Sequence, residues 1–416
     1  MESSDVMLCV QSLSELDVAI AHGRSAAQSL RQLTHWEKTL HDLADALDHA
    51  QDDVLEANTL DLEACLDMAV PERIIDWLKL NPERLCAATT SLRRLAHLGV
   101  VVQPPGIHPM MSATGREQWE PLGVVALVYE ALPELAIFAT GMCLLTGNSL
   151  ILKGGNEASQ TNQASAQVLY ETIANSPLPE DIIQAISTSE GEPTRRWLMQ
   201  STAIDLIIPY GRASLVQQVQ REALSPVLPT AISNCHLYWA ASGDEHIVAQ
   251  VITESHRGVP DPVNGIETVL VDAHISTPSL LELLRVLREA GFVCHQDGSL
   301  DAAGYLEAIN PQTWSPGKTP KTVHFRQVPD LKTAVVVINQ QSSGHADCLI
   351  TESYRDSQDF IQTVRSANTY INASPRFNRS PAQISQIALG MTAQRGLYGG
   401  RVGLSSLLAT KAVHLA

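Results

Sequence analysis

The turn at residues 153–157 carries residue types that can hold a phosphate or a ribose. Lys153 ends a short apolar run and is followed by Gly154 and Gly155, where backbone can approach a ligand closely. A lysine here can pair with a phosphate or donate to a ribose hydroxyl. The alternative is a surface lysine at an ordinary strand–helix turn. Glu157 either contacts the same ligand or is a first-turn acid that interacts with the following helix dipole.

A thiol is the strongest nucleophile in this composition, but no cysteine stands in a motif that identifies it as one. The count is odd, the positions are scattered and no C-x-x-C pair occurs. Free thiols in a reducing compartment are therefore expected, rather than disulfides or a metal site. Cys235 and Cys348 are interpreted as core thiols. The alternative interpretation is that one of them acts as a nucleophile. The seven positions are Cys9, Cys65, Cys86, Cys143, Cys235, Cys294 and Cys348.

The composition predicts a soluble, cytoplasmic protein of two or three domains. The 416 residues can bury a large core, and 44% of them are hydrophobic. A net charge of -17 argues against a nucleic-acid surface and against docking on anionic lipid. Residues 1–5 lack the pattern of a signal peptide. No run approaches the roughly 18 apolar residues of a membrane helix.

Hydrophobic spacing predicts a helical N-terminal part, from about residue 12 to 98, followed by alternating strands and helices. That alternation is typical of an α/β fold with a doubly wound parallel sheet. The expected strands are 123–129, 149–153, 181–186, 203–209, 236–239, 267–271, 292–294, 322–325, 334–338 and 369–372. The expected helices after residue 120 are 135–145, 158–174, 194–200, 279–290 and 354–367.

A series of short motifs runs in one order from residue 120 to the end of the chain. They lie at 120–130, 146–158, 208–211, 234–236, 264–268, 345–347, 372–377, 402–404 and Lys411. Together they resemble the γ-glutamyl phosphate reductase family, a branch of the aldehyde dehydrogenase superfamily. The resemblance implies an aldehyde dehydrogenase-like α/β fold. The expected divisions are an N-terminal helical part (1–108), an oligomerisation excursion (109–119), a Rossmann-like cofactor domain (120–230), a catalytic α/β domain (231–372) and a C-terminal segment with an oligomerisation arm (373–416).

The same resemblance implies a reaction and a set of site residues. Family members reduce γ-glutamyl phosphate with NADPH to glutamate semialdehyde, on the route to proline. A cysteine attacks the acyl phosphate, phosphate leaves, and hydride reduces the thioester. The implied cofactor is NADP(H); the implied partners are a small-molecule substrate and further copies of the chain, with no metal. The implied cofactor contacts are Lys153, Gly154, Gly155, Glu157, Pro209 and Gly211, and the implied substrate contacts are Glu130, Asn372 and Arg376.

The position of the family's nucleophile holds a side chain that cannot act as one. In the family a cysteine stands directly before the asparagine that resembles Asn264, and here that residue is Val263. A thiolate attacks an activated carbonyl carbon, whereas an isopropyl group does not. Pro262 lies on the other side, so a shift of one residue supplies no thiol. The catalytic assignment is therefore a vacated nucleophile position at Val263, beside Asn264.

Other polar positions depart from the family pattern, while strands and glycine turns persist. The family's Tyr-Glu-x-Arg-Pro-Asn has Leu132 in place of its arginine and Glu134 in place of its asparagine. Its Pro-Arg-Gly has Tyr210 in place of the arginine. Since an acyl phosphate needs cationic or backbone donors, these losses point away from the usual substrate.

Three functions are compatible with this pattern. The first is a γ-glutamyl phosphate reductase homologue, either active through relocated chemistry or with its thioester chemistry lost or altered. The second is a non-catalytic homologue that binds or assembles with glutamate 5-kinase or an active reductase. The third is a nicotinamide-dependent enzyme that acts on a different carbonyl without covalent catalysis. The first is the leading hypothesis.

Overall fold

The computed structural model describes residues 13–30, 37–68, 70–98, 115–186, 191–257, 261–296, 300, 307–308, 321–395 and 399–414. The chain forms two compact units. Unit 1 comprises Met1–Thr230, Arg379–Leu389 and Val402–Ala416, and unit 2 comprises Ala231–Asn378 and Gly390–Arg401. The segment after residue 372, expected as one piece, therefore contributes to both units.

The helices are α1 (Leu13–Leu30), α2 (Glu37–His49), α3 (Gln51–Asp67), α4 (Glu72–Leu78), α5 (Pro82–Ala96), α6 (Glu134–Thr146), α7 (Ser159–Ala174), α8 (Gly191–Gln200), α9 (Ala213–Glu222), α10 (Glu245–Ser255), α11 (Thr277–Glu289), α12 (Leu331–Gln341) and α13 (Tyr354–Thr363). The strands are β1 (Gly115–Pro121), β2 (Val124–Tyr129), β3 (Ser149–Lys153), β4 (Ile183–Ala185), β5 (Leu206–Tyr210), β6 (Cys235–Trp239), β7 (Ile266–Asp272), β8 (Val293–Gln296), β9 (Glu307–Ala308), β10 (Thr322–Val328), β11 (Ala346–Ile350), β12 (Asn368–Ile371), β13 (Ala388–Met391), β14 (Arg401–Gly403) and β15 (Leu408–His414). None of the helices within the described ranges is long and apolar enough to cross a membrane.

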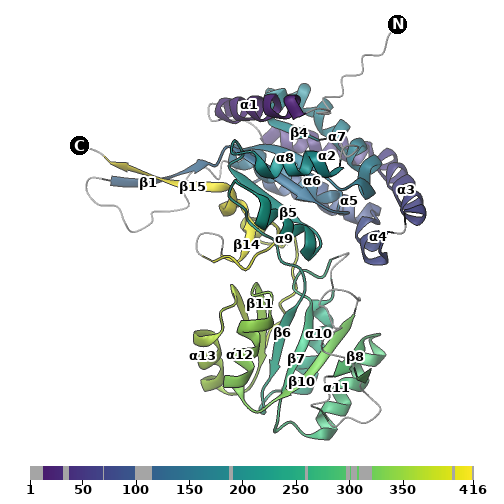
Figure 1. Cartoon of the computed structure of the whole chain (residues 1–416), viewed down its shortest axis with the longest axis vertical. Helices are drawn as coiled ribbons and strands as arrows, with labels where there is room; N and C mark the ends of the chain where they lie inside the picture. Colours follow the sequence, from purple (N-terminus) through teal and green to yellow (C-terminus); the bar gives the residue numbers. More distant parts are fainter. Residues whose placement is uncertain are drawn as a thin grey trace. The chain divides into compact units, whose positions relative to one another are not determined.

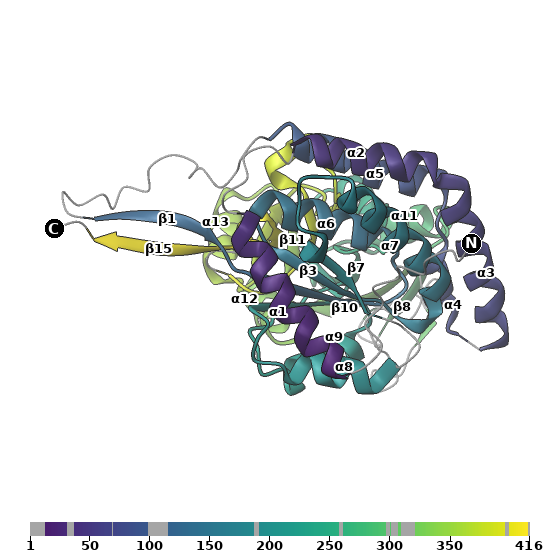
Figure 2. The ribbon, with the colours of Figure 1, turned by 90° about the horizontal axis from the view of Figure 1, so that it is seen from above.

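Unit 1 is built on a parallel sheet with the strand order β4-β3-β2-β5. β2, β3 and β5 are buried along their whole length, which explains why they are continuous apolar runs in the sequence. Helices α1, α8 and α9 pack on one face through a shared apolar cluster. Helix α6 packs on the other face, with α2 and α5 outside it (Figure 2). Gly147 ends α6 in the left-handed conformation (φ 76°), which glycine adopts without strain.

Unit 2 contains a seven-stranded parallel sheet in the order β12-β11-β6-β7-β10-β8-β9. Helices α10 and α11 cover one face, where they pack on alternate residues of β6, β7 and β10. Helices α12 and α13 cover the other face and pack on the residues between (Figure 1). Both sheets are parallel with helices on both faces, which confirms the predicted α/β class.

An antiparallel ribbon of β1 and β15 extends from the rest of unit 1 (Figures 1 and 2). The register pairs Gly115 with His414 and Pro121 with Leu408. Of the excursion expected at 109–119, residues 109–114 lie outside the described residues. The partner of its remainder comes from the far end of the chain, which short-range sequence patterns do not reveal.

The predicted strand at 334–338 is wrong, because these residues belong to helix α12. Its five apolar residues were too short a run to separate a buried strand from a buried helix. The deciding signal is Asp330, whose carboxylate caps the helix by accepting from the Thr333 amide at 2.8 Å. Sequence reasoning also missed α9, α10 and β11.

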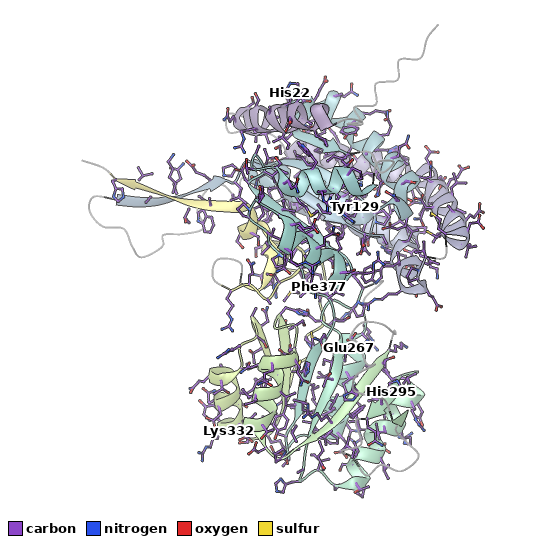
Figure 3. The ribbon with its side chains drawn as sticks, in the orientation of Figure 1. His22, Tyr129, Glu267, His295, Lys332 and Phe377 are labelled. Atoms are coloured by element: carbon purple, nitrogen blue, oxygen red, sulfur yellow. The ribbon has the colours of Figure 1, made fainter. Side chains whose placement is uncertain are left out.

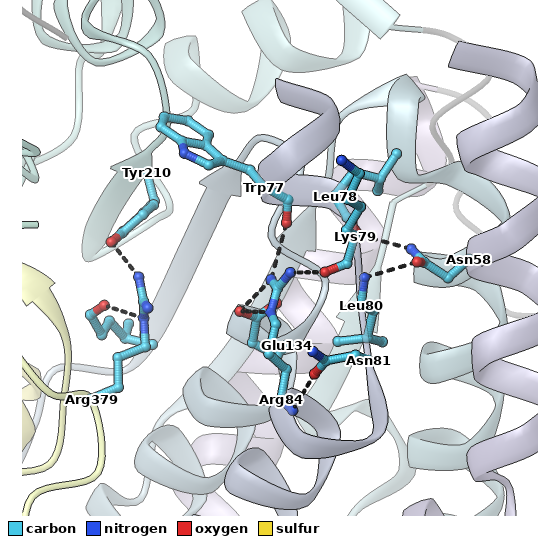
Figure 4. A network of polar contacts seen from close by, with 11 residues as sticks. Asn58, Trp77, Leu78, Lys79, Leu80, Asn81, Arg84, Glu134, Tyr210 and Arg379 are labelled. Carbon is cyan, nitrogen blue, oxygen red and sulfur yellow. Dashed lines mark hydrogen bonds and ion pairs between the residues drawn. The ribbon is translucent and has the colours of Figure 1, made fainter. Parts of the chain in front are cut away.

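A buried ion pair joins α5 to α6 (Figure 4). Arg84 Nη2 donates to both oxygens of Glu134 at 2.6 Å, and both residues are under one-tenth exposed. The same guanidinium donates to the carbonyls of Trp77 and Lys79. Glu134, the residue that replaces the family's asparagine, therefore has a dedicated cationic partner 50 residues away.

We expect Glu134→Gln to lower the free energy of unfolding by about 3 kcal/mol, because it leaves the Arg84 charge buried and uncompensated. Urea denaturation measures this loss. The matched control is Asp45→Asn, which breaks the exposed pair between Asp45 and Arg93 and should change stability little. Equal stability of Glu134→Gln and wild type would contradict the assigned role.

Candidate functional site

Polar residues gather at the carboxyl ends of three neighbouring strands in unit 1. The register places Val128 beside Lys153 and Tyr129 beside Tyr210, so the residues that follow meet at one edge of the sheet. They line a cavity of about 230 Å³. Its lining includes Glu130, Lys153, Gly154, Gly155 and Glu157, together with Arg195 and Arg212, which sequence reasoning missed.

Lys153 is buried and lines this cavity. Its side chain is 3% exposed, and its Nζ donates to the carbonyl of Gly154 at 3.0 Å. The alternative of a surface lysine is therefore wrong. A buried ammonium beside a polar cavity is suited to receive an anionic or hydroxyl-bearing ligand.

The two glycines after Lys153 make room for side chains of this same unit. A Cβ on Gly155 would lie 2.1 Å from Glu157 Oε1, and one on Gly154 would lie 2.1 Å from Asn162 Nδ2. A side chain at either position would displace the Glu157 carboxylate or the Asn162 amide from its observed place. The sequence predicted that these glycines let a ligand approach the backbone. In the structure the side chains of Glu157 and Asn162 approach the backbone there.

Glu157 holds the end of strand β2. Its Oε1 accepts from the amide of Ala131 at 2.8 Å, and Ala131 has a positive φ of 51°. Burial raises the pKa of Glu157, and the nearby Glu130 carboxylate raises it further. Glu157 lies in the short 3-10 turn Asn156–Ala158, before α7 begins.

Glu130 forms a three-contact ion pair with Arg212 at the mouth of the cavity. Its Oε2 accepts from the Arg212 amide at 2.8 Å and from Nε at 3.2 Å, and its Oε1 accepts from Nη2 at 2.9 Å. Gly211, at φ 156°, permits this contact, since a Cβ there would lie 2.6 Å from Glu130 Oε2. Pro209, the residue before Tyr210, accepts at its carbonyl from Thr230 Oγ1 at 2.7 Å.

A second, more apolar cavity of about 70 Å³ shares Tyr129 and Gly154 with the first. Leu152, Leu169 and Ile186 contribute apolar walls. Asn162 lines it too, accepting from the Tyr129 hydroxyl at 2.9 Å. Its Nδ2 is buried and has no hydrogen-bond partner in the described part of the chain. Figure 3 labels Tyr129 in unit 1.

Tyr210, which replaces the family's arginine, is paired with an arginine from the C-terminal segment (Figure 4). Arg379 Nη2 donates to the Tyr210 hydroxyl at 2.6 Å, and its guanidinium carbon lies 5.5 Å from the ring centre. Arg379 Nε also donates to the Leu389 carbonyl at 3.2 Å. A cation is thus supplied at this strand end from 169 residues away, which no local motif could indicate.

In unit 2 the loop at residues 261–265 is held by its backbone. The Val263 side chain is 1% exposed, and its carbonyl accepts from the Ser233 amide at 2.8 Å and from His345 Nε2 at 2.9 Å. Ser233 Oγ also donates to the Pro262 carbonyl at 3.1 Å. None of these contacts involves the side chain at position 263.

His345 connects this loop to Cys235 and Ser343. Since the Val263 carbonyl can only accept, His345 Nε2 carries the proton, and Nδ1 accepts from Ser343 Oγ at 2.8 Å. Cys235 Sγ lies 3.4 Å from the same Nε2. Burial lowers the pKa of His345 to about 4, so the imidazole is neutral near pH 7.

Neither alternative nucleophile has the properties of one. Cys235 and Cys348 are fully buried, and burial raises the pKa of each thiol well above its ordinary value. A reactive cysteine needs exposure and a lowered pKa. Within the described ranges, moreover, no group of three or more His, Cys, Asp or Glu residues is placed to hold a metal ion.

The structure places Pro375 against the 261–265 loop and the neighbouring Arg376 against Arg257, and it gives Asn372 a different contact. Asn264 Nδ2 donates to the Pro375 carbonyl at 2.5 Å, and Arg376 Nε donates to the Arg257 carbonyl at 3.1 Å. Asn264 Oδ1 is buried without a partner among the described residues. The Asn372 amide instead exchanges two hydrogen bonds with the backbone of Thr351. The substrate-binding roles of Asn372 and Arg376 stay predictions.

Comparisons with known proteins agree with this architecture. A sequence model of the aldehyde dehydrogenase family matches residues 6–233. NADP-dependent glyceraldehyde-3-phosphate dehydrogenase from Bacillus halodurans, solved with NADP, shares the fold with a TM-score of 0.67 at 16% identity, over 97% of this chain and 92% of that one. The protein has the aldehyde dehydrogenase fold, whose members imply a nicotinamide cofactor.

Two more similar proteins narrow the family. The chain is 39% identical over 375 residues to γ-glutamyl phosphate reductase 2 of Synechocystis sp., covering 89% of each. The γ-glutamyl phosphate reductase of Thermotoga maritima matches with a TM-score of 0.85 and 25% identity, over 96% of this chain and 98% of that one. The chain belongs to the γ-glutamyl phosphate reductase family, as the resemblance predicted.

We expect the stability difference between wild type and His345→Gln to change with pH. The folded-state pKa of about 4 lies below the ordinary 6.5, so the neutral form is favoured on folding. This stabilisation is present above pH 6.5 and is lost as pH falls toward 4, amounting to a loss of about 2 kcal/mol at pH 5. Wild type should lose this much relative to His345→Gln between pH 7 and 5 in urea denaturation.

The control for this measurement is His246→Gln, at an exposed histidine on α10, which should track wild type at both pH values. A constant difference between wild type and His345→Gln would show that burial does not keep this imidazole neutral.

Proposed function

We propose that this protein is a γ-glutamyl phosphate reductase homologue that binds NADP(H) and in which the family's thioester chemistry is lost or altered. The observation that carries the proposal is the contrast between the two units. Unit 1 has paired cavities with residues suited to a dinucleotide, whereas the 261–265 loop of unit 2 has Val263 where the family has its nucleophile.

The cavities of unit 1 fit the parts of a nicotinamide dinucleotide. The apolar cavity is suited to an adenine ring, and the buried, unpartnered Nδ2 of Asn162 offers it a donor. The adjoining cavity offers Lys153 to a ribose or its phosphate, and Arg195 and Arg212 to phosphate oxygens. The nicotinamide ring, when bound, supplies a hydride.

Several residues of the chain hold the strand ends that form this site, and none of them takes part in covalent chemistry. Glu157 fixes the end of β2 by binding the Ala131 amide, and Gly155 leaves room for its carboxylate. Arg379 and Tyr210 support the end of β5. These contacts orient a dinucleotide, and orientation is the protein's main contribution to hydride transfer.

Covalent capture of an acyl group has no nucleophile at the family's position. Residue 263 offers an isopropyl group, and the nearest described thiol in the network, Cys235, is buried and protonated. Hydride transfer to a thioester therefore lacks its preceding step. This favours a binding role, or reduction of a carbonyl without covalent catalysis.

We further propose a small-molecule ligand, a cytoplasmic location and a homo-oligomer. The β1–β15 ribbon, which extends from unit 1, supports the last of these (Figure 2). An assembly with glutamate 5-kinase or with an active reductase is the second candidate function, favoured by the absence of the nucleophile. Copurification followed by a turnover assay distinguishes this candidate from the first. A copurifying kinase or reductase supports the assembly role, whereas a homo-oligomer with turnover of its own contradicts it.

We expect wild type to bind NADPH and Lys153→Met to bind it at least about tenfold more weakly, since a charge-assisted hydrogen bond contributes about 1.5–3 kcal/mol. Fluorescence titration measures both affinities. Lys411→Met is the control, because Lys411 pairs with Glu120 on the β1–β15 ribbon. Equal affinity of wild type and Lys153→Met would remove Lys153 from the site.

We expect Val263→Cys, but not wild type, to form a covalent acyl adduct when γ-glutamyl phosphate is generated by coupled glutamate kinase. Peptide mass spectrometry locates the adduct. Val263→Ala is the control for the change in side-chain size. An adduct on a wild-type cysteine such as Cys235, or wild-type turnover of NADPH, would show that the chemistry has moved rather than been lost.

A further inference from the structure

The Glu130–Arg212 pair occupies three donors of Arg212 that an anionic ligand could otherwise use at this cavity. The Glu130 side chain is largely buried, whereas Arg212 is about half exposed, so the carboxylate is the fixed partner. The carboxylate takes the backbone N–H, Nε and Nη2 of Arg212 at once. These are the planar, paired donors that recognise phosphate oxygens elsewhere in proteins.

The backbone at Gly211 leaves room for the contact between Glu130 and Arg212. Gly211 has a positive φ and no side chain, which lets Oε2 reach the Arg212 amide. Any larger residue at 211 would separate the two partners. The carboxylate therefore sits where a phosphate oxygen would otherwise accept from the same amide and guanidinium.

We propose that Glu130 is an internal competitor for the phosphates of a dinucleotide and sets the affinity of this cavity for them. The inference rests on the proposed function, because it assumes that the cavity takes a phosphate-bearing ligand. Binding requires Arg212 to exchange the Glu130 carboxylate for a phosphate oxygen. While it stays charged, Glu130 also repels that phosphate across the same cavity.

The test compares the affinities of four proteins for NADPH and for inorganic pyrophosphate by isothermal titration. Glu130→Gln keeps the size of the side chain and removes its charge, and it should bind both probes at least tenfold more tightly than wild type. Arg212→Gln should bind both more weakly, because it removes the two guanidinium donors and leaves the carboxylate. In the double variant the gain from Glu130→Gln should be largely lost, since of the freed donors only the backbone N–H remains.

The matched control is Glu282→Gln, which removes the same charge from an arginine-paired glutamate on the surface of α11. It should bind like wild type. Glu130→Asp serves where Glu130→Gln does not fold: its shorter carboxylate withdraws from the Arg212 amide, and its affinity should exceed that of wild type. Circular dichroism and thermal melting confirm that each variant is folded.

The outcomes separate this inference from the proposed function. Binding of NADPH by wild type, with no gain in folded Glu130→Gln or Glu130→Asp, overturns the inference and leaves the proposed function standing. Tighter binding by Glu130→Gln supports the inference, including the case in which wild type shows no measurable binding. Absence of binding of either probe by any of the proteins overturns both.

Discussion

The carbonyl of residue 263, held by two buried donors, is the constraint on which the candidate catalytic loop depends. The Ser233 amide and His345 Nε2 fix it, and Ser343 fixes the imidazole in turn. A backbone contact of this kind is indifferent to the side chain that residue 263 carries. The loop can therefore keep this conformation with either valine or cysteine at position 263.

In unit 1 the governing feature is the set of hydrogen bonds that charged side chains make at the carboxyl ends of the strands. Two carboxylates, Glu130 and Glu157, take backbone amides at the ends of strands that also present Lys153 and Arg212 to the cavity. Burial raises the pKa of Glu157, and the nearby Glu130 carboxylate adds to this shift. Glu130, Glu157 and Arg212 thus already make hydrogen bonds within the protein, so a ligand that binds to these groups must replace some of those bonds.

The fold was largely predictable, because parallel strands buried on both faces are short apolar runs that glycine turns and caps delimit. Strand β3 and helix α6 show this directly. The strand predicted at 334–338 failed because five apolar residues carry no distinct period. At the site, Lys153 and Glu157 could be singled out from their types together with the resemblance to the family, and Val263 from that resemblance. The partners could not: Arg212, Arg379 and Arg84 meet their acids or aromatic ring across 50 to 169 residues.

Two of those partners pair with residues that depart from the family pattern. Glu134 stands where the family has an asparagine, and an unpaired glutamate there would carry a buried charge at a cost of several kcal/mol. Arg84 supplies the missing partner. Tyr210 stands where the family has an arginine, and Arg379 brings a guanidinium to its ring and hydroxyl. Glu134 and Tyr210 thus each have an arginine partner from a distant part of the chain, whereas at position 263 an isopropyl group stands where the family has its thiol.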